Sequence, residues 1–480
     1  MSFELSYLLP LLPQILLLVL AGLILILTLI LPKDQMRNLG WVCAVGMGLI
    51  LIASFVSRPT GDPELIWGGM LRHDWMGYIF QMLVIFGAGI TALLAMDINK
   101  LGDRGEFYIL MIASTIGMTF MASAADIVML YLAIETTSIP LYILAGFFIY
   151  DDKSTEAGFK YLLFGALTSA IMLYGLSLLY GFSGTTDIYQ IAQGVSAGGL
   201  ANAGLIGCLL LVLIGFGFKI SAVPLHFWAP DVYEGSPTPV AGFLSTASKA
   251  AGFAVLIRVL LVAFSGIELQ WGALLAAISV ATMTLGNLLA ISQHNIKRML
   301  AYSSVAHAGY ALIGLVAAGE LGISSIIFYM TIYLVTNLAA FGIVAASGRI
   351  IGSDDMTAYY GLSRRSPGLA LALLIALLSL AGMPPLGGFV AKFFVFSAAV
   401  KVDLIWLAFV GVINSIIGLY YYMTVLKYVY LYRAEGDENP LPVTRPYRLA
   451  LAILSIGIIA IGTIFAPWFN WATTAAAGLF

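Results

Sequence analysis

Charged residues are scarce in this sequence: only 10% of its 480 residues are charged, whereas 61% are apolar. A soluble domain usually carries about 25% charged residues. The composition therefore excludes an ordinary soluble domain and indicates an integral membrane protein. The formal net charge of −2 and the lack of a basic patch give no basis for nucleic-acid binding.

Cysteines and cofactor motifs are equally sparse. The two cysteines, Cys43 and Cys208, lie in separate apolar runs, without the spacing of a disulfide, an iron–sulfur cluster or a haem site. His, Cys, Asp and Glu are not clustered at metal-ligand spacing, so no metal site is expected. The sequence contains no phosphate-binding glycine loop and no G-x-G-x-x-G after a strand. Any redox or nucleotide chemistry must therefore take place on another polypeptide.

Long apolar runs fill most of the chain. Windows of about 20 apolar residues predict an all-α polytopic protein with about 14 transmembrane helices in a single membrane domain, 1–480. The first run lacks a basic leader and is too long for a signal peptide, so we expect it to be a membrane span. The expected helices are 7–31, 40–57, 78–96, 107–122, 127–148, 157–181, 202–223, 239–264, 271–292, 299–319, 322–347, 369–400, 404–430 and 446–470.

The distribution of basic residues between the loops predicts the orientation. The odd-numbered loops contain thirteen Lys and Arg residues, whereas the even-numbered loops contain only Arg58, Arg72 and Lys401. Basic residues are enriched in cytoplasmic loops. We therefore expect the odd loops on the cytoplasmic side and both termini on the opposite side, which requires an even number of spans.

A faint internal repeat connects two proline-containing segments. The sequence SAVPL at 221–225 resembles AGMPPL at 381–386, and Pro224 and Pro385 are 161 residues apart. Sliding the chain by this distance predicts a first repeat at 107–264 and a second at 271–430. Each repeat would contain five helices and one proline-broken helix. Because five is odd, the two repeats must insert upside down relative to each other, which is a transporter pattern with ion sites at the breaks.

Five charged residues fall inside runs that are long enough to cross a bilayer, namely Glu135, Lys160, Lys219, Lys249 and Lys392. A charge at the bilayer centre costs at least ~2.5–3.5 kcal/mol on insertion scales, so such residues usually carry a function. A buried lysine, unlike a buried arginine, can lose its proton, which suits a group that must take up and release protons.

Lys219 and Glu135 are predicted to act together. Lys219 precedes Pro224 by five residues, and a proline frees a carbonyl one turn back and admits water. Glu135 is about eight residues, or ~12 Å, into its helix. A carboxylate at this depth needs a nearby cation to stay charged, so we predict a Glu135–Lys219 pair. The alternatives are a Lys219 that snorkels to the interface and a static structural ion pair.

The other lysines lie at different depths. Lys249 is ten residues into its run, near the bilayer midplane, and Lys392 follows the second proline break and precedes Lys401 by nine residues. Lys160 is only a few residues into its helix, so snorkelling is a more serious alternative there. His226 and His307 could relay protons or could be hydrogen-bonded core histidines.

Three further charges receive structural interpretations. Asp231 and Glu234 follow the first break, and we expect them to cap the next helix or to line a water inlet. Arg258 lies toward the outer end of its helix, and we expect it to snorkel.

Four segments carry a resemblance to a known family. They are 224–240 (PLHFWAPDVYEGSPTPV), 158–163 (GFKYLL), 295–304 (NIKRMLAYSS) and 384–392 (PPLGGFVAK). The first resembles the hallmark of the subunit N family of proton-pumping NADH:quinone oxidoreductase (respiratory complex I). The sister subunits L and M and the Mrp-type antiporters usually read LPxAHxEAP, so the sequence PDVYEG favours N. The length and the fourteen-helix plan extend the resemblance over essentially the whole chain.

The resemblance implies roles for individual residues. Lys219, modulated by Glu135, matches the family's input-side proton site, Lys249 matches the central lysine, and Lys392 matches the output-side lysine. Lys160 and His307 match positions in the polar water chain along the membrane midplane.

The resemblance also implies the setting in which the chain works. NADH, FMN, Fe–S clusters and quinone would be bound by other subunits, and none would be bound by this chain. The partners would be a sister antiporter-like subunit and small membrane subunits in a bacterial plasma (inner) membrane. The alternatives from the residues alone are a stand-alone Na⁺ or K⁺/H⁺ antiporter and a structural scaffold with inert charges.

Overall fold

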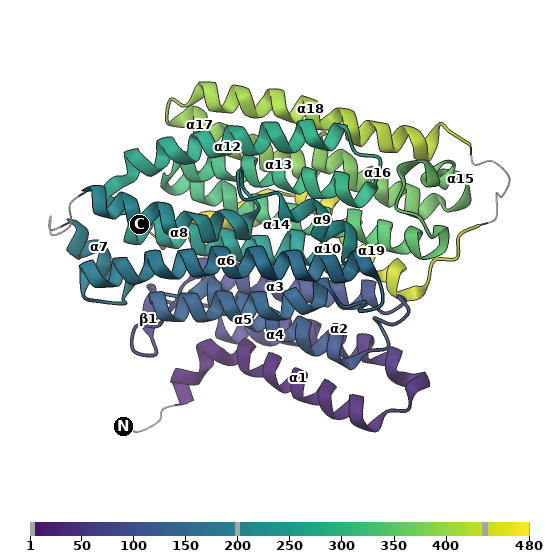
Figure 1. Ribbon diagram of the computed structural model, residues 1–480, viewed down its shortest axis with the longest axis horizontal. Helices are drawn as coiled ribbons and strands as arrows, with labels where there is room; N and C mark the ends of the chain where they lie inside the picture. The colour runs from purple at the N-terminus through teal and green to yellow at the C-terminus, as the bar shows by residue number, and fades with distance from the viewer. Residues whose placement is uncertain (1–4, 197–201, 434–439, 480) are drawn as a thin grey trace.

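Helices that run side by side make up almost the whole molecule (Figure 1). The computed structural model describes residues 5–196, 202–433 and 440–479. Within these residues, 13 helices are long and apolar enough to cross a membrane. The twelfth expected span, 369–400, is divided into the shorter helices α16 (Pro367–Ala381) and α17 (Gly387–Lys401). The predicted all-α polytopic fold is therefore confirmed.

The spanning helices follow the predicted apolar runs closely. Those that are single uninterrupted helices are α1 (Leu12–Ile30), α2 (Leu39–Ala53), α3 (Trp75–Ala95), α4 (Gly105–Ser123), α5 (Ile127–Ala145), α6 (Asp152–Ser183), α8 (Asn202–Ile220), α12 (Glu268–Ile291), α13 (Ile296–Ala317), α14 (Gly319–Ile351), α18 (Ile405–Tyr430) and α19 (Arg445–Thr463). The eighth span joins α10 (Thr238–Phe243), the π-helical η4 (Leu244–Ser248), α11 (Lys249–Arg258) and the π-helical η5 (Val259–Ala263).

Several short elements connect these helices and were not expected from the apolar pattern. The antiparallel strands β1 and β2 pair Glu64 with His73. The short elements are η1 (Leu5–Leu11), η2 (Lys33–Asn38), η3 (Ser54–Ser57), β1 (Glu64–Ile66), β2 (Leu71–His73), α7 (Ile188–Ser196), α9 (Trp228–Gly235), η6 (Ser265–Ile267), η7 (Met356–Tyr359), α15 (Leu362–Arg365) and α20 (Ala466–Ala477). The expected last helix, 446–470, is wrong at its end. The helix stops at Thr463, and Pro467 lies in the first turn of the separate helix α20. Proline has no N–H with which to continue a helix, so a new helix begins there.

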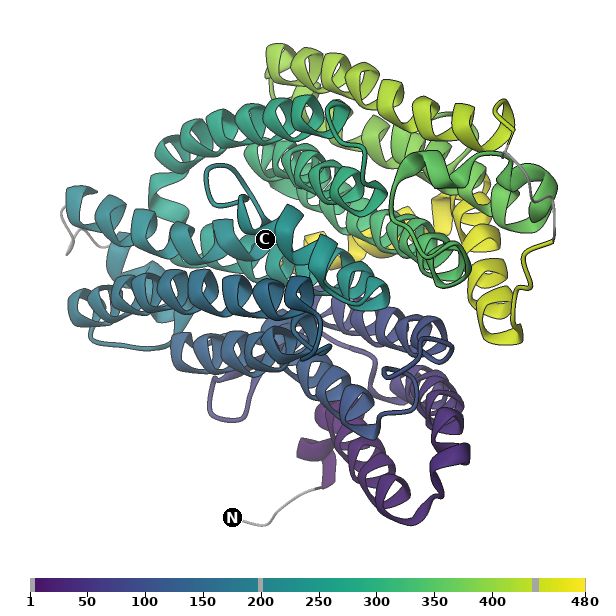
Figure 2. The same ribbon diagram turned by 45° about the vertical axis from the view of Figure 1, so that its right-hand side comes forward.

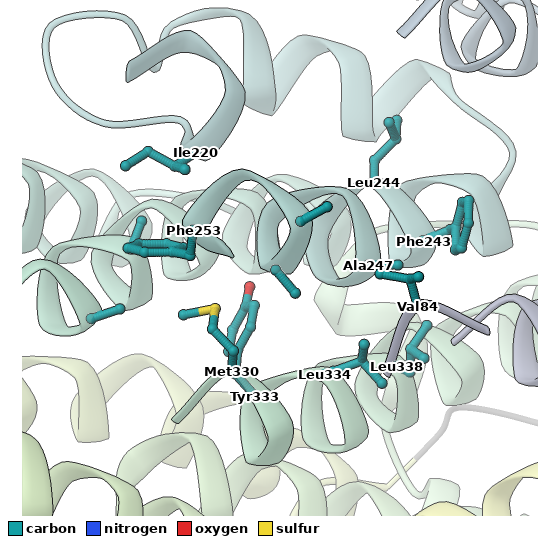
Figure 3. Packing of buried hydrophobic residues seen from close by; sticks show 14 of the residues in the cluster. Val84, Ile220, Phe243, Leu244, Ala247, Phe253, Met330, Tyr333, Leu334 and Leu338 are labelled. Atoms are coloured by element: carbon teal, nitrogen blue, oxygen red, sulfur yellow. The ribbon is translucent and has the colours of Figure 1, made fainter. Parts of the chain in front are cut away.

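The centre of the bundle is formed by the eighth span and α14. In each of these spans, 94% of an apolar stretch of 18 residues is buried, compared with 28% in the first span, Leu8–Ile30. α1 lies along one edge of the molecule and α18 along the opposite edge (Figures 1 and 2). Figure 3 shows Met330 and Leu334 of α14 close to the helix that carries Ala247 and Phe253. Helices that are apolar on all sides are expected in such a buried position.

Two spans are interrupted within the bundle. α8 ends at Ile220, Ser221 has a positive φ of 59°, and α9 begins only at Trp228. α16 ends at Ala381 and is followed by Gly382 with a φ of 88°. A Cβ atom on Gly388, at the start of α17, would lie 1.8 Å from the carbonyl oxygen of Ser379. Only glycine permits this close approach of α17 to α16.

Candidate functional site

The first part of the candidate site lies where α8 ends. Lys219 is in the last turn of α8, is 6% exposed, and donates a hydrogen bond of 3.0 Å to Ser138 Oγ on α5. Glu135 lies three residues earlier on the same face of α5 and accepts a hydrogen bond from Ser169 on α6. No direct Glu135–Lys219 ion pair occurs among the described residues; the lysine bonds to Ser138 and the carboxylate to Ser169 instead.

Lys249 lies at the centre of the molecule, immediately after the π-helical segment η4. Its side chain is buried, and Nζ donates to the carbonyl oxygen of Ser304 at 2.8 Å and to Ser304 Oγ at 2.7 Å. Gly252, one turn further along α11, lets Lys219 approach: a Cβ atom there would lie 3.2 Å from Lys219 Cγ. Lys219 and Lys249 therefore approach the same face of α11. π-Helical turns are frequent at functional sites because they reposition the residues that follow them.

A histidine and two tyrosines continue the row from Lys249. Ser303, the neighbour of Ser304 on α13, is 2.5 Å from the hydroxyl of Tyr422 on α18. The same hydroxyl is 3.2 Å from His307 Nε2, and His307 Nδ1 is 2.7 Å from the hydroxyl of Tyr329. Both ring nitrogens of the buried histidine therefore have hydroxyl partners, and each hydroxyl can either donate or accept.

Lys392 completes the row at the second break. Its Nζ donates to the last carbonyls of α16, Leu380 at 3.0 Å and Ala381 at 3.1 Å, and to Ser415 Oγ at 2.8 Å. The ammonium also lies 4.7 Å from the ring centroid of Tyr310, whose ring contacts that of His307. The C-terminal end of a helix carries unpaired carbonyls and a partial negative charge, which favours a cation there.

These groups form one buried polar row across the bundle, from α5 to α18. Its lysines, Lys219, Lys249 and Lys392, are each held by hydroxyls or carbonyls, and none has a carboxylate within salt-bridge distance in the described part of the chain. Burying an ammonium without a counter-charge is costly. Such a lysine can give up or regain a proton without breaking an ion pair, which is the behaviour required of a proton relay.

Lys160 lies outside this row, in a cluster of ion pairs with the acidic residues of α9. Its Nζ is 2.6 Å from both Asp231 and Glu156, and its side chain is 32% exposed. Arg298 Nη1 bonds to Asp231 at 2.7 Å and to Glu234 at 2.8 Å. The position of Lys160 agrees with the alternative that its ammonium reaches the interface.

Asp231 and Glu234 were expected to cap the next helix or to line a water inlet, and the first of these alternatives is wrong. Both lie on α9 and pair with cations instead. Burial raises the pKa of Glu234, but the hydrogen bonds that it accepts from Arg298 and Lys153 outweigh burial and hold that pKa below its usual value.

His226 is separate from both groups. It lies in the break between α8 and α9 and is half-buried, and its Nδ1 has no hydrogen-bond partner among the described residues. The structure therefore joins His307, but not His226, to the lysine row.

Arg258 does not snorkel, contrary to expectation. It is 1% exposed and binds Asp74 through two hydrogen bonds, at 2.8 Å and 3.0 Å. Asp74 also caps α3 by accepting from the N–H of Gly77. The planar guanidinium fits a carboxylate in this bidentate manner. The partner could not be found from the sequence, because the two residues are 184 positions apart.

The hydroxyls that connect the lysines were also missed. Ser138, Ser415 and Tyr422 carry no signal in the sequence, since the chain has many hydroxyl residues in apolar helices. Ser304 lies in segment 295–304, but its contact with Lys249 was not expected. Among the described residues, no group of three or more His, Cys, Asp or Glu could hold a metal ion.

The interrupted helices and the buried lysine row define a polytopic membrane protein of the antiporter-like class. The family described as "NADH:quinone oxidoreductase/Mrp antiporter, TM" matches residues 124–418, which is more than half of the chain. The chain is 43% identical to NADH-quinone oxidoreductase subunit N of Moorella thermoacetica over 459 residues, 95% of this chain and 96% of the relative. The chain therefore belongs to the subunit N family of NADH-quinone oxidoreductase.

Solved structures agree with this assignment. A chain of respiratory complex I from Thermus thermophilus with bound aureothin superimposes with a TM-score of 0.79 at 31% identity, covering 95% of this chain and 98% of that chain. A chain of the Mrp complex from Dietzia sp. DQ12-45-1b has a TM-score of 0.83 at 22% identity, covering 100% of this chain and 98% of that one. At that identity, the second likeness shows only the shared fold.

Proposed function

We propose that this chain translocates protons as a membrane subunit of an NADH:quinone oxidoreductase. The observation that carries the proposal is the buried row in which Lys219, Lys249 and Lys392 lack carboxylate partners among the described residues and each bond to a serine hydroxyl, with His307 and Tyr422 hydrogen-bonded to each other in the same row. The redox chemistry takes place on other subunits, which bind NADH, FMN, Fe–S clusters and quinone. Its partners are a sister antiporter-like subunit and small membrane subunits.

Charge coupling between neighbouring sites drives the transfer. Glu135 sets the charge state at Lys219, and protonation of one lysine raises the energy of a charge on the next, because like charges repel strongly at low dielectric. A proton that arrives at Lys219 therefore promotes release from Lys249. His307 and Tyr422 connect Lys249 with the region of Lys392. Lys160 and His226, outside the row, act at the water-accessible ends of the path.

We also propose how the chain is inserted. Residues 107–264 and 271–430 form two inverted five-helix repeats, and both termini are on the periplasmic side of a bacterial plasma membrane. Two observations support the repeats: α8 and α16 both end at a proline-containing break, and both C-terminal ends lie beside a buried lysine. Paired broken helices of this kind are typical of inverted repeats.

Proton pumping in inverted membrane vesicles tests the proposal. Lys249→Ala should abolish NADH-driven acidification and lower quinone turnover, while electron transfer from NADH to a water-soluble acceptor continues. Lys401→Ala, at the exposed end of α17, is the matched control and should pump normally. Full pumping by Lys249→Ala would overturn the proposal and favour a scaffold. Na⁺-dependent ΔpH formation by the chain expressed alone would favour a stand-alone antiporter instead.

A further inference from the structure

An apolar groove lies on the side of the molecule formed by the N-terminal and C-terminal helices. It has a volume of about 490 Å³ and is enclosed by α2, α3, α14, α19 and α20. Its walls include Leu83, Phe86, Val335 and Ile453. None of the lysines of the buried row lines it. Volumes of about 300–1,000 Å³ are typical of sites that bind small organic molecules.

The groove extends through about half of a bilayer. Along α3 it is lined from Trp75 to Phe86, eleven residues apart, which corresponds to ~16 Å at 1.5 Å per residue. Trp75 begins α3, and Phe86 is near its middle. The hydrocarbon core of a bilayer is ~30 Å thick. The length therefore matches one acyl chain in one leaflet.

Polar and aromatic groups gather at the end of the groove where α3 begins. Trp75, Trp468 and Trp471 line this end, and tryptophan prefers the boundary between hydrocarbon and head groups. Arg58 also lines the groove, is exposed, and has no ion pair among the described residues. Arg58 is therefore an exposed cation at this end of the groove without an acidic partner in the described part of the chain.

We propose that the groove binds an anionic phospholipid. One acyl chain fills the apolar part, and the phosphate accepts hydrogen bonds from Arg58. A guanidinium binds phosphate oxygens with charge-assisted hydrogen bonds. The bound lipid contacts α2 and α3 on one wall and α14, α19 and α20 on the other, so it joins the first helices of the chain to the last.

Photo-crosslinking in the intact complex tests this site. The complex is reconstituted with phosphatidylglycerol that carries a diazirine in one acyl chain, and the labelled peptides are identified by mass spectrometry. We expect strong labelling of the α3 segment 79–86 and of α19 near Gly457. Ala460→Phe should fill the groove and remove this labelling. Ile456→Phe, on the same helix but 66% exposed and outside the groove, is the matched control and should not change it.

A second variant tests the head-group preference. Unlabelled phosphatidylglycerol should compete better than phosphatidylcholine with the same chains, and Arg58→Gln should reduce this preference by about fivefold, the effect of one cation near an anionic lipid. Lys401→Gln is the control. Labelling of segment 79–86 no stronger than that of the lipid-facing Leu29 (80% exposed) would overturn the proposal. Protection of the groove by a helix of another subunit, or equal competition by both lipids, would also overturn it.

Discussion

Replacing Asp74 by alanine should destabilise the protein strongly, because it leaves Arg258 buried without its partner. Asp74 makes both hydrogen bonds to the guanidinium and also caps α3. Removing one member of a buried ion pair costs about 3–5 kcal/mol. Loss of the cap adds about 1 kcal/mol. The remaining contacts of Arg258, with the carbonyl oxygen of Ala122 at 3.1 Å and the Tyr189 hydroxyl at 3.2 Å, are neutral and do not replace the charge.

The neighbouring Arg72 provides a matched control. Its Nε is 3.4 Å from the same carboxylate, but its side chain is 14% exposed, compared with 1% for Arg258. Arg72→Ala leaves Asp74 with both of its hydrogen bonds from Arg258, so it should cost less, about 1–3 kcal/mol for the lost hydrogen bond to the carbonyl oxygen of Gly478.

These effects are measured as the unfolding temperature of this subunit within the purified complex in detergent. Asp74→Ala should lower the unfolding temperature more than Arg72→Ala does. The double variant Asp74→Ala/Arg258→Met should recover much of the loss, since it removes the unpaired charge. If Asp74→Ala unfolds like the wild type, or if the two substitutions are additive, the reasoning about the buried pair is refuted.

Three further predictions concern the polar row and the α9 cluster. Gly388→Ala should push α17 away from Ser379, destabilise the fold by about 1–3 kcal/mol and impair pumping. Gly368→Ala is the control and should leave stability and pumping unchanged, because a Cβ atom there would meet nothing within 4 Å. Equal pumping in both variants would contradict the role of this contact. Tyr422→Phe removes the hydroxyl between Ser303 and His307 and should lower the rate of proton pumping in vesicles. Tyr420→Phe is the control and should not lower it, because Tyr420 is 63% exposed. An unchanged rate in Tyr422→Phe would show that protons bypass His307. Because the pKa of Glu234 is lowered in the folded protein, its ion pairs stabilise the fold above the usual glutamate pKa of about 4.3 and lose this effect as pH falls. Glu234→Gln should therefore lower the unfolding temperature at pH 7 by an amount that shrinks as the pH falls below about 4.3, and a pH-independent difference would contradict the assignment.

The membrane fold could be predicted from the sequence alone because the apolar runs are long and nearly free of charge. Burial of such runs in lipid fixes the number and approximate bounds of the helices without reference to any distant residue. The positions of Lys219, Lys249 and Lys392 were visible for the same reason, since a charge inside an apolar run stands out. The end of the last span was missed because hydropathy continues past Thr463, whereas the helix does not.

The partners of the charges were decided only by the tertiary structure. Asp74 lies 184 residues from Arg258, and Ser138 lies 81 residues from Lys219. Whether an arginine near a helix end snorkels or is buried depends on what packs beside it, and no local pattern contains that information. The sequence alone therefore determined which charges fall within the apolar runs. The packing of α5, α11, α13 and α18 decided which of them form one row, because hydrogen bonds between helices depend on distances that only the folded bundle defines.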